Sequence, residues 1–195
     1  MKIKTNWYNF LLVILIVFCL IMLIIQNINL ITGKTTSGII TSNVTINNYL
    51  AISFSDNLSA GILFGEVSVL PSLNTNASHN YDGVDSVTDY YVIISNDSNT
   101  GVDLCVKADN NLVDLAGDVL GLDNETYANS TSTNGTLPDL SNEISLTTSY
   151  VKSGDNIAIG TNNYYRFWLD IPVSQPSGNY NNTIYFKGIQ TGNSC

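Results

Sequence analysis

The hydrophobic pattern begins with one long apolar run near the N-terminus. Residues 10–25 are apolar without interruption, and Lys2 and Lys4 precede them. Counted from residue 7, the run is long enough to cross the ~30 Å hydrocarbon core of a bilayer as an α-helix. We therefore predict a transmembrane helix at about residues 7–25, within an N-terminal signal anchor that spans residues 1–31.

The residues on either side of the run predict its orientation and its fate. Lysines before a helix favour a cytoplasmic N-terminus, so the rest of the chain would lie outside the cell. A cleaved signal peptide usually ends in a small-x-small site, and residues 26–31 contain none. We expect the helix to remain as an anchor in the cell membrane. Secretion of the domain after cleavage of the leader is the alternative.

Beyond this run, apolar and polar residues alternate over short segments, and clusters of Asn, Gly, Ser and Asp separate them. A period of two residues is typical of β-strands. The expected strands cover residues 50–55, 62–69 (with a bulge at Gly65), 90–94, 102–107, 144–151, 156–159, 164–171 and 180–187. About seven to nine short strands in one domain predict an all-β fold, a two-sheet sandwich of immunoglobulin-like type.

Polar segments divide the exported part further. Residues 32–43 are rich in Thr, Ser and Gly, which predicts a flexible tether, and residues 44–195 form the extracellular β domain. Within that domain, residues 109–142 are expected to be a polar excursion with one strand near 119–127. Residues 71–89 are expected to be a polar loop.

The penultimate strand carries the candidate partner face. One of its faces bears Tyr164, Arg166 and Trp168, and Tyr185 points outward from the last strand. Aromatic residues and arginine are enriched among the anchors of protein interfaces. The alternative is that residues 109–142 fold over this row and bury it.

Charge narrows the classes of partner. The whole chain has a net charge of −9, and residues 34–195 hold five basic and all sixteen acidic residues, a net charge of −11. Such a surface repels nucleic-acid phosphates. The expected partners are the membrane, through the N-terminal helix, and other cell-surface proteins or further copies of the chain.

Export makes each Asn-x-Ser/Thr triplet a glycan acceptor. Eight such triplets occur, and we predict N-glycosylation at some of them. They begin at Asn43, Asn57, Asn76, Asn96, Asn124, Asn129, Asn134 and Asn181.

The cysteines also agree with export. Cys105 and Cys195 are the two cysteines beyond the leader, and an even pair outside the cell predicts a disulfide. An intermolecular link through Cys195 is the alternative. The alternating pattern places Cys105 on the outward face of its strand, beside Asp103.

Candidate chemistry is sparse. Asp97, Asn99 and Asp103 space oxygen donors as a calcium loop does, but a turn between two strands explains the same pattern, and no bidentate glutamate follows. His79 is the single histidine, and no nucleophile elbow or phosphate-binding loop is present. We expect neither an enzyme nor a cofactor.

Two stretches resemble a group of known proteins. Residues 62–67 (ILFGEV) resemble an apolar–FG–x–V strand of exported microbial sandwich proteins, and residues 167–184, with FWLDIP and PSGNYNNTI, resemble their final hairpin. Archaeal and bacterial cell-surface and filament subunits belong to this group, among them TasA-like fibre proteins, WxL-type surface domains and pilus-type subunits. The resemblance implies a β-sandwich with a role at the cell surface.

Together these features predict a membrane-anchored, N-glycosylated surface protein that does structural or adhesive work through protein–protein contacts. One alternative is a secreted filament subunit in which residues 34–48 add a strand to a neighbouring copy. Another is a carbohydrate-binding module that uses the Trp168 face as a sugar platform.

Overall fold

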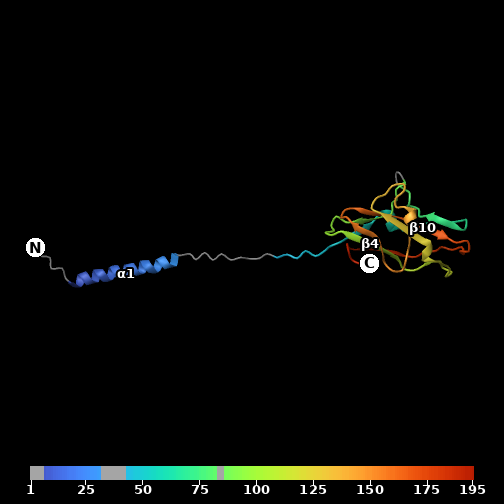
Figure 1. The fold of residues 1–195 in the computed structure, drawn as a ribbon. Helices are drawn as coiled ribbons and strands as arrows, with labels where there is room; N and C mark the ends of the chain where they lie inside the picture. The colour runs from blue at the N-terminus through green and yellow to red at the C-terminus, as the bar shows by residue number, and fades with distance from the viewer. Residues whose placement is uncertain (1–6, 32–42, 83–85) are drawn as a thin grey trace. The chain divides into compact units, whose positions relative to one another are not determined.

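The computed structural model describes residues 7–31, 43–82 and 86–195 (Figure 1). The chain divides into two units, residues 1–45 and 46–195, and each is described by itself. The predicted tether lies outside the described residues, except for Asn43.

The first unit contains helix α1 (Trp7–Ile31). Its 25 residues would extend over about 37 Å at 1.5 Å per residue. Apart from Asn9, the side chains described along it are apolar or aromatic, and all are exposed, which is unfavourable in water and favourable in lipid. α1 is thus long and apolar enough to cross a membrane, as a signal anchor or as a signal peptide.

The second unit is mostly β, with antiparallel sheets. Its short helices are α2 (Asp56–Ala60), η2 (Leu122–Asn124) and η3 (Leu140–Asn142). Its strands are β1 (Ile52–Phe54), β2 (Ser72–Asn76), β3 (Tyr91–Ile94), β4 (Val102–Ala108), β5 (Leu112–Val113), β6 (Val119–Leu120), β7 (Glu125–Ser130), β8 (Ile144–Ser145), β9 (Val151–Ile157), β10 (Asn162–Ile171) and β11 (Ile184–Gln190).

Strand β10 organises the larger sheet. β7 pairs with it from Tyr164 to Leu169, and β8 pairs with β7. The other edge of β10 is shared by two strands: β3 pairs near its start, and β2 pairs near its end, where Trp168 lies opposite Asn76. β1 extends this sheet beyond β3. β10 is therefore an interior strand with neighbours on both edges.

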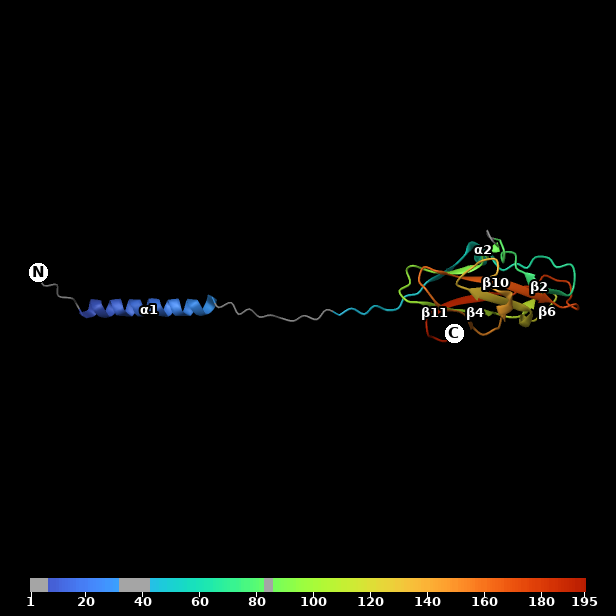
Figure 2. The same cartoon turned by 45° about the horizontal axis from the view of Figure 1, so that its top comes forward.

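The smaller sheet has the order β11–β4–β9, and Figure 2 shows β11 and β4 side by side. Leu104 and Val106 of β4 lie in the same hydrophobic cluster as Tyr165 and Phe167 of β10. The two larger sheets thus contribute to one shared core, whose burial from water stabilises the domain. A smaller cluster of Leu112, Leu120 and Leu169 attaches the β5–β6 hairpin to β10.

The alternating pattern correctly predicts the core-facing side chains of β10 and β11. Tyr165 and Phe167 are buried, and Ile184 and Phe186 pack against the same cluster. The strand predicted at residues 62–69, however, is absent, and so is its bulge at Gly65. Ile62 and Phe64 do pack against the core, but this stretch is not paired with a strand. Its hydrogen bonds to residue 78 are accepted by the carbonyl of Leu63, to which Ser78 donates through its backbone N and its Oγ.

Two polar stretches contain more strand than the sequence pattern predicted. β2 lies in the expected loop 71–89. The expected excursion 109–142 contains β5, β6 and β7, where the pattern predicted a single strand near 119–127 that β6 and the start of β7 occupy. β2 and β7 form because the two edges of β10 supply hydrogen-bond partners, a tertiary effect that outweighs a weak local preference for strand.

Two core tyrosines provide a matched test of buried hydroxyl groups. Tyr165 Oη contacts Ser153 Oγ at 2.9 Å and accepts from Asn163 Nδ2 at 2.8 Å, whereas Tyr127 Oη is buried without a partner. We expect Tyr165→Phe to lower the free energy of unfolding by about 1–3 kcal/mol, because it removes one hydrogen bond each from the buried side chains of Ser153 and Asn163, which keep only longer contacts of 3.3 or 3.4 Å. Tyr127→Phe should leave that free energy unchanged or raise it by about 1 kcal/mol. Urea denaturation of both variants measures the difference, and equal losses would contradict the assignment.

Candidate functional site

The expected partner face does not assemble. Because β10 is an interior strand and loops cover its second face, Arg166 and Trp168 are each only 1% exposed. Tyr164 is half-buried against Tyr91. Tyr185 is exposed, but it belongs to β11 in the other sheet. The alternative given by the sequence, a cover from residues 109–142, accounts for part of this burial, and contacts with residues 76–82 and with Ser86 account for more of it.

Arg166 holds that cover in place through main-chain carbonyls. Its Nε donates to Asn80 O at 2.9 Å, its Nη1 to Pro138 O at 2.8 Å, and its Nη2 to Ser86 O and Asn134 O at 2.9 and 2.7 Å. The guanidinium also lies 4.1 Å from the centre of the Tyr81 ring. Burial lowers the pKa of Arg166 from its usual value. Its surroundings indicate a structural role in tying two loops to β10.

Trp168 is likewise fixed inside the domain. Its indole Nε1 donates to Asn76 Oδ1 at 2.9 Å. A sugar platform needs an exposed ring face, and the 1% exposed ring of Trp168 does not provide one in this structure.

The structure contains the disulfide between Cys105 and Cys195, with a Cα–Cα distance of 5.9 Å. Cys105 does not belong to the core cluster that contains Leu104 and Val106, in agreement with the outward position that alternation predicts. It is nevertheless buried, because the C-terminal segment folds back to it. Lys187 Nζ donates to Cys195 O at 3.4 Å. Cys19, in α1, is free.

Asp103, two residues before Cys105 on β4, also binds the C-terminal segment. It is fully buried and accepts from Lys152 Nζ at 2.6 Å, from Asn156 N at 2.7 Å and from Gly192 N at 3.1 Å. Burial by itself would raise the pKa of Asp103, but these donors outweigh it and lower the pKa to about 2. The carboxylate is therefore charged, and its hydrogen bonds are made to groups within the domain.

The candidate calcium ligands are not brought together. Asp103 is committed to Lys152, Asn99 Oδ1 accepts from Tyr49 N, and Asp97 contacts Ser95. Among the residues that the structure describes, no group of three or more His, Cys, Asp or Glu side chains has the arrangement of a metal site.

A feature that the sequence analysis missed lies on the outer face of the β11–β4–β9 sheet. Lys107 Nζ lies 5.0 Å from the centre of the Tyr150 ring and 5.3 Å from that of Tyr185, and Lys187 Nζ lies 5.4 Å from that of Tyr150. Lys107 is opposite Tyr185 in the β4–β11 register. We call these four residues the lysine–tyrosine face. The sequence could have indicated this face, because alternation along the two strands places Lys107, Tyr185 and Lys187 on the side that points away from the core.

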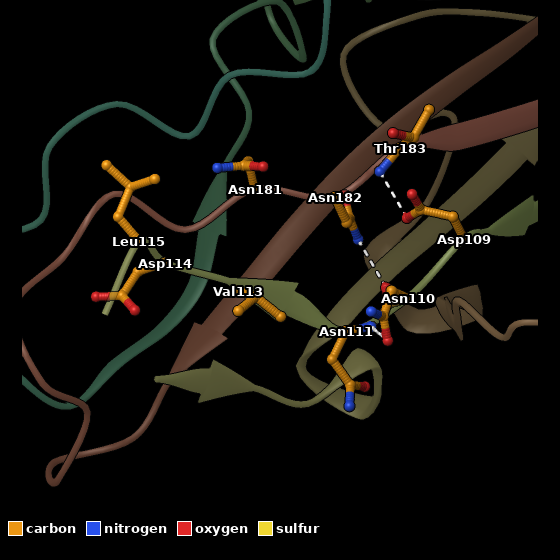
Figure 3. A pocket seen from close by; sticks show the side chains of 9 residues that line it. All are labelled: Asp109, Asn110, Asn111, Val113, Asp114, Leu115, Asn181, Asn182 and Thr183. Atoms are coloured by element: carbon orange, nitrogen blue, oxygen red, sulfur yellow. Dashed lines mark hydrogen bonds between the residues drawn. The ribbon is translucent and has the colours of Figure 1, made fainter. Parts of the chain in front are cut away.

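A shallow polar hollow of about 290 Å³ lies where β4 ends and β11 begins (Figure 3). Its lining residues are Asp109, Asn110, Asn111, Val113, Asp114, Leu115, Asn181, Asn182 and Thr183. Asp109 accepts from Thr183 N at 2.8 Å, and Asn182 Nδ2 donates to Asn110 O at 3.5 Å (Figure 3). These bonds join the end of β4 to the start of β11.

Glu125 is a buried carboxyl group that contacts one of these lining residues. It is 2% exposed, and Asn182 Nδ2 donates to its Oε2 at 2.6 Å. Burial raises the pKa of Glu125 to about 7, and the bond from Asn182 offsets only part of that increase.

This shifted pKa predicts a pH-dependent stability. Between pH 4.5 and about 7, the folded state keeps the Glu125 proton while the unfolded state loses it, so the free energy of unfolding falls as the pH rises through this window. The loss is about 3 kcal/mol. Glu125→Gln removes it: the variant should match the wild type near pH 4 and be more stable by about that amount at pH 8. Urea denaturation across this range measures the effect, and parallel stability curves would contradict it.

The predicted glycan acceptors fall into two groups. The side-chain amide nitrogens of three donate inside the domain: Asn57 to Asp89, Asn124 to Gly121 and Asp123, and Asn129 to Asn163. The other five are exposed: Asn43, Asn76, Asn96, Asn134 and Asn181. In the Asn134 triplet, Thr136 donates to Asn134 Oδ1 through both its backbone N and its Oγ1 at 2.8 Å, so these bonds use the side-chain oxygen of Asn134 and not its amide nitrogen.

Comparison with known proteins adds no family to this description. No protein-family model matches the chain, and no curated protein sequence is significantly similar to it.

Proposed function

We propose that this chain is a membrane-anchored, N-glycosylated cell-surface protein that does structural or adhesive work through protein–protein contacts. The main observation behind this proposal is that one chain contains both the apolar helix α1 and a disulfide within the β domain. Disulfides persist in oxidising surroundings, and the lysines before α1 favour a cytoplasmic N-terminus. In this proposal α1 is a retained anchor, and the β domain is an immunoglobulin-like two-sheet sandwich, supported by the core that its two larger sheets share.

Topology is the first test. Cells that express the full chain with one epitope tag before residue 1 and another after residue 195 are treated with an external protease. The proposal expects loss of the C-terminal tag and survival of the N-terminal tag. A tag found free of the β domain before proteolysis would indicate cleavage of the leader, and protection of both tags would contradict the proposal.

Glycosylation is tested separately, by mass spectrometry of the native chain. The proposal expects glycans at the exposed acceptors, with Asn134→Gln and Thr136→Ala each removing the same glycan mass. Asn129→Gln is the matched control, because the Asn129 amide donates to Asn163. An unmodified chain from a host that glycosylates other exported proteins would contradict this part.

A secreted filament subunit is the second candidate. Val44 and Ile46 alternate in the segment before β1 and are 79% and 78% exposed. Such a segment has the pattern of a strand that adds to the edge of another sheet. Electron microscopy of the purified chain tests it: Val44→Ser with Ile46→Ser should abolish fibres, and fibres that persist in this variant would contradict it.

A further inference from the structure

The exposed positive charge of the β domain gathers on one face. Residues 43–195 contain four basic residues, and Arg166 is buried. Lys107, Lys152 and Lys187 are the other three, and β4 with its two neighbours carries all of them. Lys152 is neutralised by Asp103 and Asp155 at 2.6 and 3.0 Å.

Lys107 and Lys187 differ from Lys152. In the part of the chain that the structure describes, neither forms an ion pair with an Asp or Glu side chain; both lie against the ring of Tyr150, and Lys187 Nζ also donates to Cys195 O at 3.4 Å. Two ammonium groups beside one ring repel each other, and a carboxylate placed between them would relieve that repulsion. The lysine–tyrosine face is thus suited to an anionic partner with an apolar part that packs against the tyrosine rings.

The same domain presents a segment of that chemistry. The loop that joins β5 to β6 carries Asp114 and Asp118 on either side of Leu115, which is fully exposed at 103%. Its shape is set internally, because Asp118 N donates to Asp114 Oδ1 at 2.8 Å and Asp114 N to Asp118 O at 3.1 Å. Gly117 has φ +89°, which suits glycine at this turn. A preformed loop loses little entropy on binding.

We propose that the lysine–tyrosine face binds the β5–β6 loop of a second copy of this chain. Asp114 and Asp118 pair with Lys107 and Lys187, and Leu115 packs against Tyr150 and Tyr185. The two contacting surfaces differ, so the contact is head-to-tail and extends to further copies. The inference rests on the proposed function in one respect: copies anchored in one membrane have a high effective concentration, at which a small contact suffices.

The test is sedimentation of the full chain in detergent micelles at low and high salt. We expect salt-sensitive oligomers for the wild type, since exposed charge pairs are screened. Lys107→Glu with Lys187→Glu should be monomeric, and so should Asp118→Lys. An equimolar mixture of these two variants should recover association, because each supplies the charge that the other lacks. Glu66→Lys is the control: it makes the same change of charge as Asp118→Lys at an exposed position outside both surfaces, and this variant should associate as the wild type does.

A wild type that stays monomeric at low salt, or a mixture that fails to associate, would overturn the proposal. So would a monomeric wild type that binds a polyuronate or heparin through Lys107 and Lys187, since the occupant would then be a glycan. Intact disulfide and unchanged circular dichroism show that each variant folds. The protease-protection assay on the same variants separates this contact from the proposed function, because correct topology without association refutes only the contact.

Discussion

Replacing Arg166 with methionine should lower the free energy of unfolding by about 3–5 kcal/mol. The substitution removes a charged donor from four main-chain carbonyls at once. Each buried acceptor left without a donor costs about 1–3 kcal/mol, less where water reaches it. Urea denaturation followed by near-ultraviolet circular dichroism measures the loss.

Arg166→Lys is the matched control. A lysine keeps the charge but has one nitrogen, so it cannot reach carbonyls on both loops in the geometry of a guanidinium. We expect it to recover less than half of the lost stability, and limited proteolysis should cut near residues 134–138 in both variants before the core unfolds. Full recovery by lysine would show that charge, rather than the fork of donors, holds the loops.

Loss of the disulfide should have an effect of similar size. Cys105 and Cys195 close a loop with a sequence separation of 90 residues, and in the chain-entropy account such a cross-link contributes about 4–5 kcal/mol. The double variant Cys105→Ala with Cys195→Ala should lose this amount in urea denaturation. Alanine at both positions avoids a free thiol.

Reduction of the wild type should reproduce that loss, and Cys19→Ala should leave the stability of the β domain unchanged, since Cys19 lies in α1. A loss of less than about 1 kcal/mol would show that the C-terminal segment is held chiefly by its hydrogen bonds to Asp103 and Lys187, or that the unfolded chain is already compact.

Some of the fold followed from local patterns. The apolar run predicted α1 because every residue of a spanning helix must suit lipid. Alternation predicted the inward positions of Tyr165 and Phe167, because successive side chains of a strand point to opposite faces. The disulfide followed from counting the cysteines beyond the leader.

Other features depended on what covers a face. Alternation placed Arg166 and Trp168 on the second face of β10, but it carries no information on whether a loop lies above that face. Cys105 and Asp103 were assigned outward for the same reason, and the C-terminal segment buries them. At residues 62–69 the pattern predicted a strand that does not form. Apolar side chains such as Ile62 and Phe64 can pack against the core without their backbone pairing with a neighbouring strand.

By itself the sequence determined one apolar helix, a β-rich acidic domain, one cysteine pair and the acceptor triplets, since these depend on composition and on periods of a few residues. Tertiary structure alone decided which strands share β10, which acceptors have free amides and where the lysines meet. Those outcomes depend on contacts between residues tens of positions apart, such as Arg166 with Asn80 and Lys187 with Tyr150. The energy of such contacts comes from burial and from pairing across the fold, which no local pattern contains.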